Sequence, residues 1–177
     1  LSLASTIGAT LARGRGEELI ADALQAIRVT MARGSAEDRA ALLRGLQDFG
    51  AGVAQFDDQK LASAKEALTR SASDLPLVAN PLRFSARFYL AVNEYYFDAS
   101  RGLVLLDALL AEIPAGRYPA LTGRICWIAG SIDKVQGRVQ SSVHRYERAA
   151  ASLRQSGGKS AAAFADGMNF AFLYDRE

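Results

Sequence analysis

The stretch from Ala120 to Gln155 constrains the fold most, because apolar residues recur every three or four positions on both sides of a single glycine, Gly137. This spacing places apolar side chains on one face of a helix. They are Leu121, Ile125, Trp127, Ile128 and Ile132 before the glycine, and Val139, Val143, Tyr146, Ala149, Ala150 and Leu153 after it. Only Gly137 and its neighbours are available for a turn, so the two helices must fold back antiparallel. The sequence therefore predicts a helical hairpin here.

The rest of the chain repeats this pattern of paired helices. Helical spacing is present over residues 2–13, 17–33, 36–56, 59–71, 82–97, 101–113 and 160–174. No window sustains the alternation typical of a strand, which indicates an all-α protein of about nine helices. Gly52, Leu90 and Gly130 mark equivalent places about 40 residues apart, within the range of stacked helical-pair repeats. We expect one domain over residues 1–177, with hairpins at about 1–34, 36–72, 80–114 and 118–156 and an unpaired helix at 159–176.

Charge and hydropathy exclude several classes of partner. The chain has 21 basic and 19 acidic residues, a net charge of +2, so no strong field draws it to nucleic acid or to an anionic membrane. Its arginines are spread over several helices, and we expect this segment to bind no nucleic acid. No apolar run reaches about 18 residues, so we expect no membrane-spanning helix. Because the chain begins at Leu1 and not at Met, we expect it to be part of a longer protein.

The residues that usually carry chemistry are few and scattered. His144 and Cys126 are the only histidine and cysteine, so no His/Cys zinc site can form and no catalytic triad has further support. Cys126 lies in an apolar run, which is typical of a buried thiol in a reducing compartment, and we expect a cytoplasmic location. The sequence SGGKS at 156–160 predicts a turn and a helix N-cap, because no strand precedes it as in a phosphate-binding loop. We expect no enzyme activity, no cofactor and no metal.

The hairpin at 120–155 resembles a tetratricopeptide repeat. The matching residues are Trp127, Gly130, Gly137, Ser142, Tyr146 and Ala149, with looser matches at Gly52, Ala64, Leu68 and Pro76 and at Gly102, Leu106 and Pro114. Degenerate repeats of about 40 residues are similar to the helical arrays of large bacterial multidomain regulators. There the array lies beside an ATPase and a DNA-binding module, or beside a caspase-like peptidase. The resemblance implies a right-handed superhelical stack of antiparallel hairpins.

Such a stack implies a concave groove lined mainly by the first helix of each hairpin. The groove residues that the resemblance implies are Arg87, Glu94, Tyr95, Arg124, Trp127, Ser131 and Lys134, with Phe49, Val53, Phe56 and Ala91 among the wider set. The basic ones would face an acidic peptide or ligand. Tyr95 and Trp127 would be apolar anchors or, alternatively, core between repeats.

Three functional hypotheses are open at this point. The first is a non-enzymatic module that binds a protein or peptide in the groove, within a bacterial regulatory or signalling protein. The alternative is a domain of a transcription regulator that senses a small-molecule effector. The third is self-association through the unpaired terminal helix.

Overall fold

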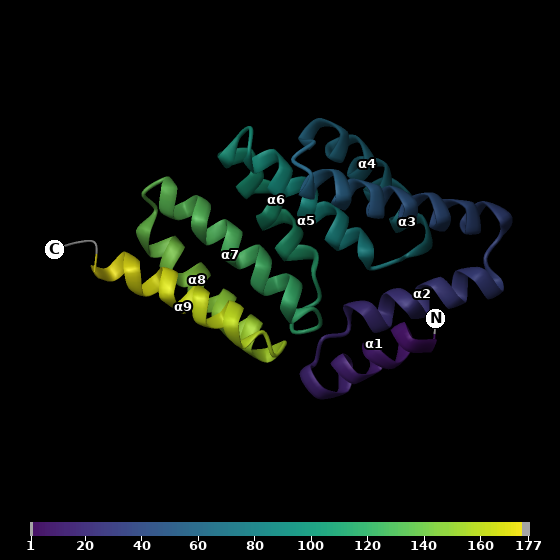
Figure 1. The fold of residues 1–177 in the computed structure, drawn as a ribbon, viewed down its shortest axis with the longest axis horizontal. Coiled ribbons are helices and arrows are strands. Elements are labelled where there is room, and N and C mark those ends of the chain that lie inside the picture. The colour runs from purple at the N-terminus through teal and green to yellow at the C-terminus, as the bar shows by residue number, and fades with distance from the viewer. Residues whose placement is uncertain (1, 175–177) are drawn as a thin grey trace.

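The computed structural model describes the backbone of residues 2–174, and the side chains except those of residues 1–5, 7, 11, 15 and 169–177. Over these residues the chain forms nine α-helices and one 3₁₀ helix, without a strand (Figure 1). The helices are α1 (Ser2–Arg15), α2 (Leu19–Arg33), α3 (Ala36–Asp57), α4 (Leu61–Asp74), η1 (Leu75–Val78), α5 (Leu82–Tyr95), α6 (Ala99–Glu112), α7 (Pro119–Val135), α8 (Val139–Gln155) and α9 (Lys159–Tyr174). The predicted all-helical fold is confirmed. Residues 175–176 of the predicted terminal helix lie outside the described residues.

Local signals set the ends of several helices. Ser35 and Asp38 form a capping box at the start of α3: the Asp38 amide donates to Ser35 Oγ at 3.1 Å, and the Ser35 amide donates to Asp38 Oδ2 at 2.8 Å. Asp98 caps α6 with its side chain, which accepts from the Arg101 amide at 3.0 Å. Between α7 and α8, Gly137 has φ +72°, a left-handed conformation that side chains disfavour. The turn predicted at Gly137 is therefore present.

Each helix packs against the next one along the chain. Contacts join every consecutive pair from α1 to α9, and α5 also contacts α3 and α7, the first helices of the flanking pairs. Figure 1 shows the pairs α3 with α4, α5 with α6 and α7 with α8 succeeding one another across the molecule. Most of the fold is thus built from neighbours in sequence.

Two of the helix pairs share one packing pattern. In each pair, the first helix has two buried glycines, two helical turns apart. Each glycine lies against a large side chain of the following segment, and these two side chains are also two turns apart. The contacts join Gly45 to Leu75, Gly52 to Leu68, Gly123 to Leu153 and Gly130 to Tyr146. Absence of a Cβ lets the backbones approach closely, which offsets the low helix propensity of glycine.

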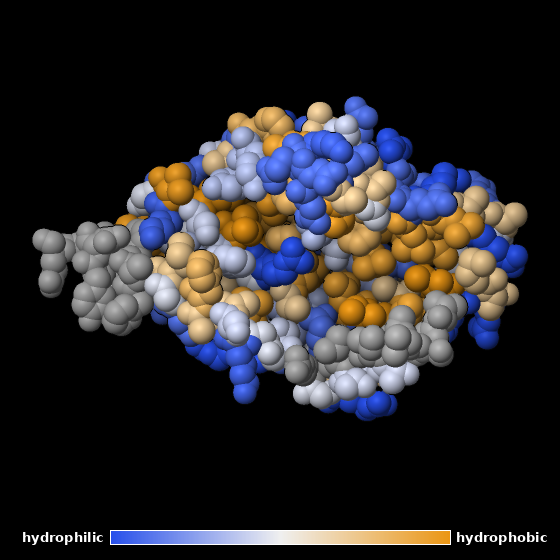
Figure 2. Space-filling view, viewed as in Figure 1, coloured by the Kyte–Doolittle hydropathy of each residue, from blue (hydrophilic) through white to orange (hydrophobic). Residues whose placement is uncertain are grey.

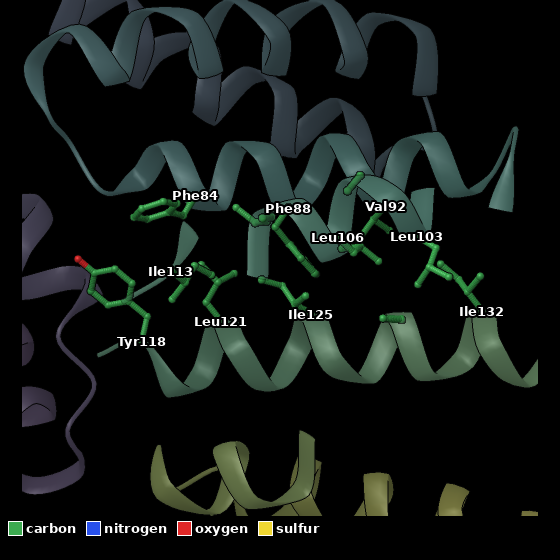
Figure 3. Close-up of a cluster of buried hydrophobic side chains, with 13 residues drawn as sticks. Phe84, Phe88, Val92, Leu103, Leu106, Ile113, Tyr118, Leu121, Ile125 and Ile132 are labelled. Atoms are coloured by element: carbon green, nitrogen blue, oxygen red, sulfur yellow. The ribbon is translucent and has the colours of Figure 1, made fainter. Parts of the chain in front are cut away.

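The main core lies where α5, α6 and α7 meet. Figure 3 shows Phe84, Phe88 and Val92 of α5 directed towards Leu121 and Ile125 of α7, with α6 side chains between them. A second cluster joins α7, α8 and α9 and consists largely of alanines, which permit close helix approach. These two clusters hold α5 to α9 together.

The start of α2 reaches a distant part of the chain. Arg117, between α6 and α7, donates from Nε to Asp22 Oδ2 at 2.8 Å and from Nη2 to Oδ1 at 2.9 Å. The Tyr118 hydroxyl donates to Asp22 Oδ2 at 2.8 Å, and the Ala120 amide donates to buried Glu17 at 2.8 Å. Glu17 thereby satisfies a free amide at the N-terminus of α7. Helix α2 is thus tied to the α6–α7 connection as well as to α3.

Candidate functional site

A hollow of about 200 Å³ lies between α3, α5 and α7. We call it the aromatic hollow; its lining residues are Phe56 of α3, Phe88, Tyr89, Val92 and Tyr96 of α5 and its C-cap, and Arg124, Trp127 and Ile128 of α7. Figure 2 shows apolar side chains gathered along the middle of the molecule, where Figure 1 places α5 between α3 and α7. The hollow therefore belongs to the first helices of three successive pairs.

Aromatic rings form much of its wall. The Tyr89 ring lies edge-on to Phe56 and Phe88, with centroid distances of 5.4 and 5.6 Å, and 6.3 Å from Phe49. The Tyr96 ring lies 6.1 Å from Phe56 and is 52% exposed. Edge-to-face pairs contribute about 0.5–1.5 kcal/mol beyond their buried area, so these rings hold one another in place. The wall is thus a cluster of mutually packed rings.

Arg124 provides the charge of the hollow. Its guanidinium carbon lies 4.5 Å from the centroid of the Phe88 ring and 5.5 Å from that of Tyr89. The residue is exposed, and among the described residues no carboxylate lies within ion-pair distance of it. Stacking engages the face of the guanidinium and leaves its in-plane N–H groups available to an anion. The site thus combines an apolar wall with one accessible cation.

Trp127 has contacts on two sides. It lines the hollow, and its ring also lies edge-on to Phe164 of α9, with centroids 5.3 Å apart. It packs against the alanine-rich cluster of α7, α8 and α9 as well. The two alternatives for this residue, a groove anchor or core between helices, therefore both describe it.

Arg87 and Glu94 lie apart from Arg124 and Trp127. They line a second hollow of about 200 Å³ between α4, α5 and α6. Arg87 donates to the Glu112 carboxylate, with Nη2 to Oε1 at 2.7 Å, and the buried Glu94 carboxylate pairs with Lys65 and Arg101. Helix α5 contacts α3, α4, α6 and α7, and the two hollows are lined by different residues of it: Arg87, Leu90 and Glu94 in one, and Phe88, Tyr89 and Val92 in the other. Helical spacing alone could not tell which face carries the groove.

The other predicted residues are spread around the hollow. Tyr95 packs against the main core beside Gly102 of α6. Ser131 Oγ lies 3.0 Å from the Tyr146 hydroxyl, between α7 and α8. Lys134 is partly exposed in the last turn of α7. Of the residues predicted to line a groove, the structure therefore brings together Arg124, Trp127 and Phe56 in the aromatic hollow.

Sequence reasoning missed five lining residues: Phe88, Tyr89, Val92, Tyr96 and Ile128. The signal that could have found three of them is the apolar stripe of Tyr89, Val92 and Tyr96. These residues follow one another at steps of three and four, the spacing of one helix face.

A buried carboxylate elsewhere serves the packing of α6, α7 and α8. Asp133 accepts hydrogen bonds from Ser141, from Arg138 Nε at 2.7 Å and from Arg145 Nε at 2.7 Å, and Arg145 also pairs with Asp107 of α6 at 2.6 Å. Burial by itself would raise the pKa of Asp133, but the hydrogen bonds from Ser141 and Arg138 and the charge of Arg145 outweigh it and lower the pKa. The carboxylate is thus held ionised, as a structural ion pair requires.

Other groups capable of chemistry are dispersed. Cys126 is buried between α7, α8 and α9, and this burial raises the pKa of its thiol, which disfavours the nucleophilic thiolate. His144 is exposed on α8. Within the part of the chain that the structure describes, no three His, Cys, Asp or Glu side chains are placed to hold a metal ion.

Comparison of the chain with protein-family models, with curated proteins and with solved structures gives no match. The tetratricopeptide resemblance therefore stays a prediction. No helix among residues 2–174 combines the length and the apolar character that a membrane crossing demands. The geometry itself defines a class: an all-helical chain of consecutively packed helices with an aromatic, singly cationic hollow on three of them.

Proposed function

We propose that this chain is a non-enzymatic helical-repeat module that binds a protein or peptide segment in the aromatic hollow. The architecture proposed is the right-handed tetratricopeptide-like stack, supported by the glycine pattern that α3–α4 and α7–α8 share. By the resemblance to arrays in bacterial regulators, the module would act in the cytoplasm as part of a regulatory or signalling protein. The hollow then lies on the face formed by the first helices, where such stacks bind their partners.

The observation that carries this proposal is that exposed Tyr96 and Arg124 lie beside a wall of mutually packed aromatic rings. Tyrosine, tryptophan and arginine are the residue types that most often dominate protein interfaces. The hollow of about 200 Å³ is smaller than the 300–1,000 Å³ typical of small-molecule sites, so one apolar side chain of a peptide suits it better. Arg124 adds a preference for an acidic group beside that side chain.

A peptide library displayed on phage tests the proposal, followed by affinity measurements on the selected peptides. We expect sequences with an apolar side chain next to Asp or Glu. The double variant Tyr96→Ser with Arg124→Gln should bind them about 30-fold more weakly, as for the loss of a hot spot of about 2 kcal/mol.

The matched control is Phe97→Ser with Arg39→Gln, which removes an exposed ring and an exposed arginine outside the hollow. It should leave affinity unchanged. The proposal is wrong if no peptide is selected, or if both double variants bind the selected peptides as well as the original chain does.

A further inference from the structure

A separate cavity of about 390 Å³ lies where α2 meets the α6–α7 connection. We call it the corner cavity. Its walls come from four parts of the chain: Asp22 of α2, the connection before α5, Arg83 and Phe84 at the start of α5, and the segment from Glu112 to Tyr118. Unlike the aromatic hollow, it falls within the 300–1,000 Å³ range of small-molecule sites. It is open to solvent, and its size permits a small ligand to lie in it.

Both carboxylates in the wall already have arginine partners. Asp22 accepts from Arg117 through both oxygens and from the Tyr118 hydroxyl. Glu112 accepts from Arg87 through both of its oxygens. Their negative charges are largely balanced by these arginines, so the preference of the cavity depends on the remaining charged group.

That group is Arg83. Its guanidinium carbon lies 4.5 Å from the centroid of the Phe84 ring, and the residue is partly buried. Within the described residues, no carboxylate comes within ion-pair distance of Arg83. The charge of Arg83 is felt at Glu112, where it is a minor influence beside the hydrogen bonds from Arg87. A partly desolvated guanidinium without a direct counter-ion favours an anion.

The wall beside Arg83 is apolar. The Phe84 and Tyr118 rings lie 5.9 Å apart between centroids, both residues are almost fully buried, and prolines 81 and 114 complete this side. The two rings form the packed floor of the cavity, and a small apolar group could lie over this floor and against exposed Pro114 while an attached anionic group meets Arg83. This pairing of features is typical of specific small-ligand sites, which are mostly apolar with a few placed polar groups.

We propose that the corner cavity binds a small organic carboxylate with a compact apolar body, through an ion pair to Arg83. This site is distinct from the aromatic hollow and does not depend on the peptide-binding function. Because Asp22 forms one wall, the cavity is complete only while α2 is docked on the α6–α7 connection. Binding of the carboxylate therefore stabilises that docking.

Titration calorimetry with benzoate tests the proposal directly on the unaltered chain, with benzamide as the neutral isostere. Benzoate should bind saturably with a dissociation constant of about 1 mM or lower. Benzamide should bind about tenfold more weakly, because it lacks the charge-assisted hydrogen bond. Arg83→Gln should weaken benzoate binding by a similar factor, and the exposed-site control Arg39→Gln should not change it.

Hydrogen exchange gives a second measurement that a purely structural role of Arg83 would not alter. Benzoate should slow amide exchange in α2 around Asp22 and leave the rate unchanged in the Arg83→Gln variant. The proposal is overturned if benzoate does not saturate, if benzamide binds equally well, or if Arg83→Gln binds benzoate as the original chain does. Peptide affinity at the aromatic hollow should be the same in Arg83→Gln, so failure of one proposal is distinguishable from failure of the other.

Discussion

Alanine at two neighbouring glycines of α3 should change stability in opposite directions. A Cβ built on Gly52 would lie 2.6 Å from Leu68 Cγ and 2.9 Å from Leu68 Cδ2, and Leu68 is fully buried. A Cβ built on Gly50 would meet no atom within 4 Å, and Gly50 is exposed. The two positions share one helix and differ mainly in what faces them.

The magnitudes follow from two opposing effects. Alanine is a better helix former than glycine by about 0.8–1 kcal/mol, and Gly50→Ala should gain about that much. At Gly52 the new methyl meets the branch carbon of a buried side chain, and such overpacking costs about 1–3 kcal/mol. Because the contact is with Cγ and not with the end of a flexible side chain, the cost should lie in the upper part of this range, about 2–3 kcal/mol. After the propensity gain, Gly52→Ala should lower the free energy of unfolding by about 1–2 kcal/mol.

Urea denaturation followed by circular dichroism measures both changes, and thermal melting should show a separation of about 5 °C for a chain of this size. The double variant Gly52→Ala with Leu68→Ala removes the clashing side chain, so Gly52→Ala should no longer destabilise in that background. The reasoning fails if Gly52→Ala is as stable as the original chain, or if Gly50→Ala is the more destabilising of the two.

Three further predictions concern buried or long-range polar contacts. Asp133→Ala removes the buried carboxylate that Arg138 and Arg145 share, and because Arg145 keeps its contact with Asp107 the change should cost about 2 kcal/mol near pH 7. Because the folded-state pKa of Asp133 is lowered, this difference between the original chain and the variant should be complete above about pH 4 and shrink as pH falls further, in urea titrations at several pH values. Ser71→Ala removes a buried hydroxyl that donates to a carbonyl of α3 at 2.9 Å and should cost about 1 kcal/mol, whereas Ser73→Ala, at an exposed site, should cost almost nothing in the same denaturation assay. Asp22→Asn weakens the contact with Arg117 and Tyr118, so amides in the first half of α2 should exchange faster while those of α7 and α8 do not; equal rates in α2 would contradict its attachment through Asp22.

The helices and the tight turns could be predicted because their causes are local. The three-to-four spacing around Gly137 predicted α7 and α8, and the positive φ of this glycine accounts for the turn. Of the three glycines in α3, Gly45 and Gly52 lie against neighbouring side chains. Gly50 faces open space, which no local pattern distinguishes from a packed position.

The candidate site could be predicted only in part. Arg124 and Trp127 line the aromatic hollow as expected, but Arg87 and Glu94 lie on the opposite side of α5, where each has charged partners. Helix α5 carries Arg83, Arg87 and Glu94 along one stripe and mainly apolar residues on the rest of its surface, and its spacing does not say which side borders a groove. Only the positions of α4 and α6 decide which side chains remain for the hollow.

The sequence by itself therefore determined an all-helical chain and its helix pairs, because backbone hydrogen bonding and amphipathic spacing act within a few residues. It also contained the glycines that form turns between helices or let helices approach closely. Tertiary structure alone decided which helix faces meet and where charges are neutralised. The contact between Asp22 and Arg117 shows why. It joins side chains 95 residues apart in the sequence, and no local pattern around either residue predicts its partner. That contact closes the corner cavity, just as the meeting of three helices forms the aromatic hollow.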